Sequence, residues 1–217
     1  FRGRIQYDHN TDSMQLRTAA TERLRIDSSG RLIVGTDTAS SAGESQYSLL
    51  EVSGNTSGAT GSGLVTIKKG EAASAMSNGD TIGRLIFAGK TGGDFAQIQV
   101  NVDGSPSGSD FPGNMRFNIC ADGASTPVER MRIDSSGRLG LGRVPGSWHS
   151  NNTSVIQMKD GGGILTRTGG TFLGLYQNIE YNSQDVSKYT ANGAASAYIQ
   201  DSGSHKWYTV ASGTAGA

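Results

Sequence analysis

Apolar and polar residues alternate along two stretches of the chain that are nearly identical. Residues 22–35 read ERLRIDSSGRLIVG and residues 129–142 read ERMRIDSSGRLGLG, with eleven of fourteen positions identical at an offset of 107 residues. In the first stretch Leu24 and Ile26 lie on one face of a two-residue period, with charged residues between them. The match indicates a duplicated unit. The alternation predicts β-strands, because Gly30 interrupts any helical stripe.

The Asp-Ser-Ser-Gly sequence in each copy predicts a tight turn. Asp27 stands at the first turn position and Gly30 at the fourth, which are the residue preferences of a type I turn closed by a left-handed glycine. Alternation then resumes, so each copy is predicted to form a β-hairpin with Arg31 and Ile33 facing outward. The positions predicted to face inward are Leu24, Ile26, Leu32, Val34, Met131, Ile133, Leu139 and Leu141.

Flanking residues extend the repeat. The corresponding segments are 3–7 with 83–87, 13–17 with 114–118, and 49–52 with 155–158. Residues 96–102 (AQIQVNV) alternate strictly and are predicted to be a strand added in the second copy. A third unit is predicted to begin near Gly169, and its expected strands are 172–176, 197–200 and 206–210.

The repeats predict an all-β chain of short antiparallel hairpins in four segments. These are a first β unit (1–36), a Gly/Ser-rich connecting segment (37–80), a second, longer β unit (81–143) and a third, divergent β segment (144–217). Within the connecting segment, the low-complexity run GNTSGATGSG at 54–63 is expected to be a loop or a flexible spacer.

Composition indicates how these strands find a core. Only 35% of the residues are hydrophobic and 32 are glycine, so the chain is expected to bury its apolar stripes against copies of itself. The net charge is zero, whereas a nucleic-acid binder is expected to carry an excess of basic residues. No apolar run approaches the ~20 residues of a membrane span. The single Cys120 excludes an intrachain disulfide and is expected to be a small strand hydrophobe.

Enzymatic and metal chemistry find little support. The AGKT sequence ending at Thr91 lacks the P-loop spacing, since Gly83 comes one residue too early, and a turn rather than a helix is predicted to follow. Most aspartates stand at turn positions, and Glu22 and Glu129 are expected to form structural ion pairs with arginine. The isolated histidines are His9, His149 and His205. We therefore expect no catalytic residue, no cofactor and no metal site.

Aromatic residues outside the duplicated hairpin allow two interpretations. Trp148, Trp207 and Tyr208 are candidate glycan contacts, because exposed rings can stack on sugar faces. Alternatively, these rings fill an apolar core between chains or between stacked units, which we favour.

The string ERLRIDSSGRLIVGT, preceded by GRIQYDHNTDSMQLRT, resembles the repeated segments of tail-fibre and related virion structural proteins of bacteriophages, especially those of marine cyanobacterial phages. Residues 81–143 are similar to a longer version of the same unit. The resemblance implies an elongated homotrimeric fibre, of the β-prism or triple-β-helix kind, with two further copies of the chain as partners. The self-cleaving chaperone domain that ends many such fibres has no counterpart here, so no catalytic residue is carried over.

The function implied is that of a structural, non-enzymatic tail-fibre segment, a rigid spacer or adhesive arm for host-cell attachment. Its expected location is the virion, outside the cell. Its expected partners are other virion tail proteins and a bacterial surface glycan or protein receptor, with no nucleic acid and no membrane insertion. The alternatives are a bacterial surface adhesin built from β repeats and a polysaccharide-degrading tailspike. A capsid or neck fibre is a further alternative within the virion.

Overall fold

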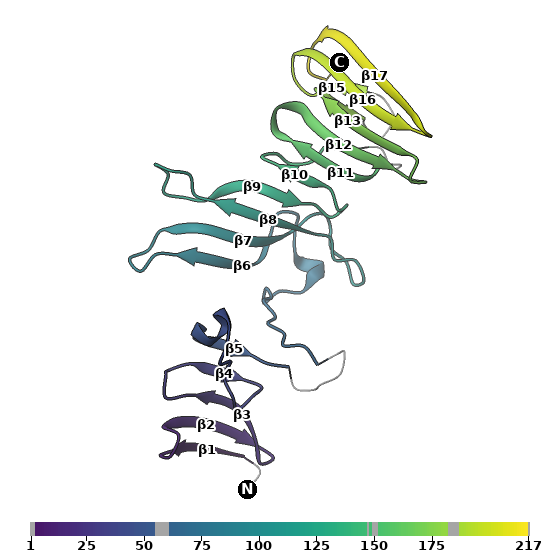
Figure 1. The fold of residues 1–217 in the computed structure, drawn as a ribbon. Coiled ribbons are helices and arrows are strands. Elements are labelled where there is room, and N and C mark those ends of the chain that lie inside the picture. The colour runs from purple at the N-terminus through teal and green to yellow at the C-terminus, as the bar shows by residue number, and fades with distance from the viewer. Residues whose placement is uncertain (1–2, 55–60, 147, 149–151, 182–186, 217) are drawn as a thin grey trace. The chain divides into compact units, whose positions relative to one another are not determined.

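The computed structural model describes residues 3–54, 61–146, 148, 152–181 and 187–216 and shows an all-β protein (Figure 1). The all-β prediction is confirmed: apart from short 3₁₀ turns, the described residues form strands, turns and irregular segments, and most strand pairs are antiparallel. The chain divides into two compact units, Phe1–Thr66 and Ile67–Ala217. The boundary between them lies inside the predicted connecting segment.

The first unit holds one five-stranded sheet whose strand order follows the sequence. Its strands are β1 (Gly3–Asp8), β2 (Ser13–Thr18), β3 (Thr21–Ile26), β4 (Leu32–Val34) and β5 (Leu50–Val52). The first four strands form an antiparallel meander, as expected from turns of two to five residues. β5 lies parallel to β4, because residues 35–49 cross over between the two strands.

The second unit holds a ten-stranded sheet in the order β17-β16-β13-β12-β11-β10-β9-β8-β7-β6. Its strands are β6 (Thr81–Ala88), β7 (Asp94–Val102), β8 (Gly113–Ile119), β9 (Val128–Ile133), β10 (Leu139–Leu141), β11 (Asn152–Met158), β12 (Gly162–Arg167), β13 (Phe172–Gln177), β16 (Gly193–Asp201) and β17 (Ser204–Gly213). β10 and β11 are parallel, and every other neighbouring pair is antiparallel. A separate ribbon consists of β14 (Ile179–Tyr181) and β15 (Ser187–Tyr189).

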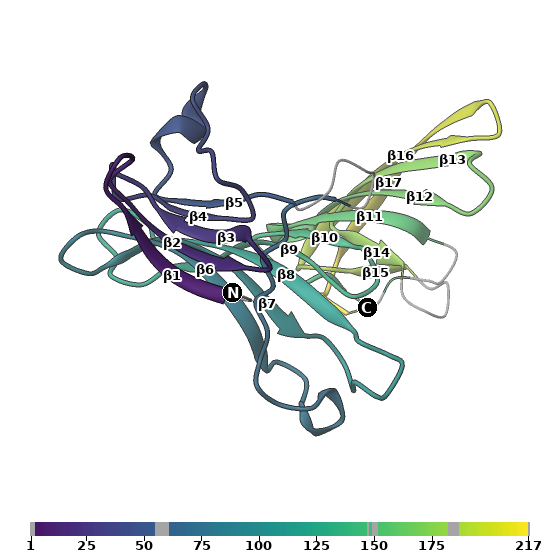
Figure 2. The same ribbon diagram turned by 90° about the horizontal axis from the view of Figure 1, so that it is seen from below.

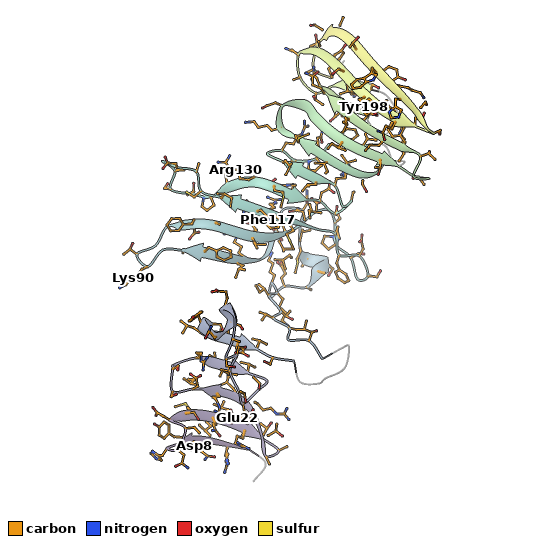
Figure 3. All side chains as sticks on the ribbon, in the orientation of Figure 1. Asp8, Glu22, Lys90, Phe117, Arg130 and Tyr198 are labelled. Carbon is orange, nitrogen blue, oxygen red and sulfur yellow. The ribbon has the colours of Figure 1, made fainter. Side chains whose placement is uncertain are left out.

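The duplicated motif folds into the same hairpin twice. In β3–β4, Leu24 pairs with Val34; in β9–β10, Met131 pairs with Leu141. Each copy also has a β-bulge at the same place, and the extra residue is Arg23 in the first copy and Arg130 in the second (Figure 3). The predicted hairpin and the alignment of 13–17 with 114–118 are confirmed.

Residues 96–102 form a strand as predicted, within β7, but β7 is not the strand added in the second copy. In the first unit, β1 is the neighbour of β2, with Ile5 opposite Leu16. In the second unit the neighbour of β8 is β7, with Ile98 opposite Phe117, so residues 96–102 take the place of β1. The additional strand is β6, at the edge of the sheet. Sequence similarity between 3–7 and 83–87 could not reveal this, because both β6 and β7 alternate and only pairing identifies the neighbour.

A small buried core lies on one face of the second sheet. It consists of Trp148, Val155, Leu165, Tyr176, Ala197 and Ile199. Ile179 of β14 packs against this cluster, so the β14–β15 ribbon covers that face of the sheet (Figure 2). The opposite face has no such cover from the described residues.

Candidate assembly surface

The first unit carries two apolar rows on one face of its sheet. Residues directly opposite on neighbouring strands share a face, so the pairing register defines each row. The rows, together the unit 1 apolar face, are Tyr7, Met14, Ile26, Leu32 and Leu50, and then Ile5, Leu16, Leu24, Val34 and Val52. Six of these ten side chains are exposed, and Ile5 retains 76% of its accessible surface.

The second unit repeats this arrangement over more strands. The unit 2 apolar face has one row of Val100, Met115, Ile133, Leu139, Ile156, Ile164, Leu175, Tyr198 and Trp207, and another of Leu85, Ile98, Phe117, Met131, Leu141 and Met158. Phe117, on β8, and Tyr198, on β16, are labelled in Figure 3. An open apolar groove of about 470 Å³ lies where Leu175, Tyr198 and Trp207 meet.

The eight positions predicted to face inward all belong to these two apolar faces. They are Leu24, Ile26, Leu32, Val34, Met131, Ile133, Leu139 and Leu141. The described part of the chain buries none of them: each is half-buried or exposed, and Ile133 keeps 43% of its surface accessible. Sequence reasoning missed the other members of the rows, although alternation within their strands was a usable signal.

The opposite face of each hairpin is polar and more deeply buried. The Glu22 carboxylate accepts two hydrogen bonds from the Arg25 guanidinium, at 2.5 and 3.0 Å. The Glu129 carboxylate holds Arg132 in the same way, at 2.7 and 2.6 Å. This hydrogen bonding raises the pKa of the Arg132 guanidinium above its usual value, against the effect of partial burial. The predicted ion pairs of Glu22 and Glu129 are therefore present.

Ile33 lies on this polar face, and the prediction that it faces solvent is wrong, since it is 1% exposed. Crossover segment 35–49 is held near it. The Arg31 guanidinium donates to the carbonyl oxygens of Ser40 and Gln46, and the Ser40 amide donates to the Glu51 carboxylate at 2.9 Å. Alternation within one strand cannot reveal such a cover, because it comes from residues that carry no periodic signal.

In the second copy, a glycine stands where the first copy has the buried Ile33. Gly140 takes the position of Ile33, since each is the central residue of its three-residue strand and pairs with the parallel strand beside it. A Cβ atom at Gly140 would lie 2.1 Å from the Arg143 carbonyl oxygen. The shorter crossover therefore passes directly over the sheet and leaves no room for a side chain.

The turns of the two hairpins share one hydrogen-bond network. Asp27 Oδ1 accepts from the amides of Ser29 and Arg31, both at 3.0 Å, and Asp27 Oδ2 accepts from the Arg31 guanidinium at 2.7 Å. Desolvation alone would raise the pKa of Asp27, but these hydrogen bonds outweigh it and hold the pKa below its usual value. Asp134 makes the equivalent bonds with Ser136 and Arg138. The repeated carboxylates thus have local structural partners.

The three candidate glycan contacts differ in their surroundings. Trp148 is buried at 6% exposure in the core, and its Nε1 donates to Gln157 Oε1 at 3.2 Å, so its ring offers no face to a ligand. Trp207 is 79% exposed and contacts Tyr198 in a tilted ring pair, with 4.4 Å between the ring centroids. Tyr208 is also exposed but points to the opposite face of β17, because neighbouring strand residues alternate.

The remaining positions singled out from the sequence are the AGKT segment, the histidines and Cys120. Lys90 lies at the tip of the β6–β7 turn, which the Gly89 amide closes on the Gly93 carbonyl, so the predicted turn is confirmed (Figure 3). No group of three or more metal-type ligands gathers among the described residues. His149 lies outside the described residues. Cys120, after β8, is a free half-buried thiol.

No family model matches this sequence, and a search of curated proteins finds no match to it. In the described part of the chain, no helix is long and apolar enough to cross a membrane.

Proposed function

We propose that this chain is a structural, non-enzymatic segment of a bacteriophage tail fibre, acting as a rigid spacer or adhesive arm in host-cell attachment. One observation carries the proposal: both copies of the duplicated unit cover their polar face and leave their apolar face open. An isolated globule buries its apolar face first, because apolar burial is the dominant favourable term in folding. The open faces therefore call for a partner.

Identical chains are the partner that fits this surface. Both apolar faces carry aliphatic and aromatic side chains and no formal charge, so they match each other and offer nothing to a charged ligand. A second copy offers the same two faces at the same spacing along the chain. Two further copies would enclose the rows around a common axis, as in the β-prism or triple-β-helix that the resemblance implies.

Duplication suits a spacer better than a catalyst. Repeated units add length while each contacts only its neighbours, and the same scaffold can be used again without a new core. The carboxylates retained in both copies, Glu22 with Glu129 and Asp27 with Asp134, hold arginines and turn amides. In the virion, other tail proteins and a bacterial surface glycan or protein receptor would be the further partners.

Native mass tests this proposal directly. Light scattering of the purified chain is expected to give three times its 22.6 kDa mass. A single-chain mass at micromolar concentration would overturn the proposal. Incubation with host envelope polysaccharide separates the fibre from a degrading tailspike: the fibre releases no new reducing ends, whereas a tailspike does.

A further inference from the structure

Residues 64–66 of the first unit have the sequence of a strand but pair with no strand among the described residues. Leu64 and Val65 are 77% and 71% exposed, and residues 61–69 make no backbone hydrogen bond with the described part of the chain. Exposed apolar side chains on a backbone whose N–H and C=O groups are not paired with another strand favour strand addition, as at the edge of a sheet.

The second copy identifies the strand with which this segment should pair. Gly63-Leu64-Val65-Thr66 matches Gly163-Ile164-Leu165-Thr166 at an offset of 100 residues. In the second unit this sequence is β12, which pairs with β11 and places Ile164 opposite Ile156 and Thr166 opposite Ser154. The counterpart of β11 in the first unit is β5, since both lie parallel to the second strand of the hairpin.

β5 has a free edge where this partner belongs. It is the last strand of its sheet, and the adjacent Leu49 and Leu50 are 72% and 57% exposed. By the register of the second copy, Leu64 would lie opposite Leu50 and Thr66 opposite Ser48. Leu64 would then extend the row that ends at Leu50, as Ile164 extends the row beyond Ile156.

The length of the connection distinguishes the two copies. β11 and β12 are joined by the three residues Lys159–Gly161, which force pairing within one chain. Ten residues, 53–62, rich in Gly, Ser and Thr, separate β5 from Gly63. The chain passes the end of β5 at Gly63, whose Cβ would lie 2.3 Å from the Val52 carbonyl oxygen, and then continues without pairing. A connection of this length permits exchange of a strand between copies.

We propose that residues 63–66 of one copy add as an antiparallel strand to the free edge of β5 in a second copy, with Leu64 opposite Leu50. Each copy then both donates and accepts a strand, so neither the segment nor the edge remains unpaired. This inference rests on the proposed self-assembly and specifies one of its contacts.

A cysteine pair tests the exchange. In a Cys120→Ser background, Ser48→Cys with Thr66→Cys places two thiols directly opposite in the proposed register, at a Cα separation of roughly 4.5–5.5 Å that a disulfide can bridge. Mild oxidation is expected to link chains covalently, seen as multimers on a non-reducing gel. A matched control, Ser48→Cys with Val65→Cys, shifts the register by one residue and is expected to stay unlinked, because the second thiol points to the other face.

The two single-cysteine chains provide a second measurement. When Ser48→Cys and Thr66→Cys chains are assembled together, the proposal predicts a disulfide between unlike chains. A disulfide only within one chain, or none in the proposed register, overturns the exchange. Native mass of the same samples separates the failures: an assembled particle with an intrachain disulfide leaves the proposed function standing, whereas a single-chain mass contradicts both.

Discussion

At the scale of the residue, the polar positions of the repeat are as specific as the apolar ones. Glu22 and Glu129 each accept hydrogen bonds from one arginine through both carboxylate oxygens. A bidentate pair of this kind fixes the orientation of the two side chains in addition to pairing their charges. The Arg132 side chain is only 9% exposed, so the ion pair lies in a partly desolvated site. Replacement of either partner should therefore have a measurable cost.

Glu129→Gln is expected to lower the free energy of unfolding of the second unit by roughly 2–3 kcal/mol, because Arg132 would keep its buried charge without a full counter-charge. Urea denaturation measures the change. Glu71→Gln is the matched control: Glu71 pairs with Lys69 at 2.6 Å, but its side chain is 40% exposed, and a loss below about 1 kcal/mol is expected. Equal losses of unfolding free energy in the two variants would show that the Glu129–Arg132 pair stabilises the fold no more than an exposed ion pair does.

At the scale of the element, the sequence predicted what is local and missed what depends on distant residues. The hairpins were predictable, because a two-residue period and an Asp-Ser-Ser-Gly turn specify a hairpin by themselves. The edge position of β6 was not, because β6 and β7 both alternate and only the pairing of β7 with β8 shows which strand is the neighbour. Burial of Ile33 depends on crossover segment 35–49, and the burial of Trp148 depends on β11 and β12. The apolar faces were predicted in part, through their eight hairpin positions.

The strand faces lead to opposite predictions for two aspartate substitutions. Ile133→Asp, on the unit 2 apolar face, is expected to abolish assembly but leave the strand content of the chain intact, because the site is open in the single chain. Val155→Asp, in the core at 2% exposure, is expected to unfold the second unit. Light scattering and circular dichroism measure the two effects. An Ile133→Asp variant that keeps the assembled mass would show that this face is not the interface.

At the scale of the whole molecule, the polar composition and the open apolar faces have one common explanation. Only 35% of the residues are hydrophobic, and many of these lie in the two rows of each open apolar face. Burial of apolar surface contributes about 25 cal/mol per Å². If identical chains supply that burial, folding and association are linked, and the measured stability of each chain depends on the concentration of its partners.

The melting temperature should therefore rise with protein concentration. A tenfold increase adds up to about 1.4 kcal/mol per associating chain, and for a domain of this size such a gain shifts the melting temperature by roughly 2–5 °C. Differential scanning calorimetry over a hundredfold concentration range measures the shift. The Ile133→Asp chain is the internal control: having lost its partners, it should melt at one temperature throughout. A wild-type chain that melts independently of concentration, at dilutions where light scattering shows dissociation, would mean that its stability resides within the single chain.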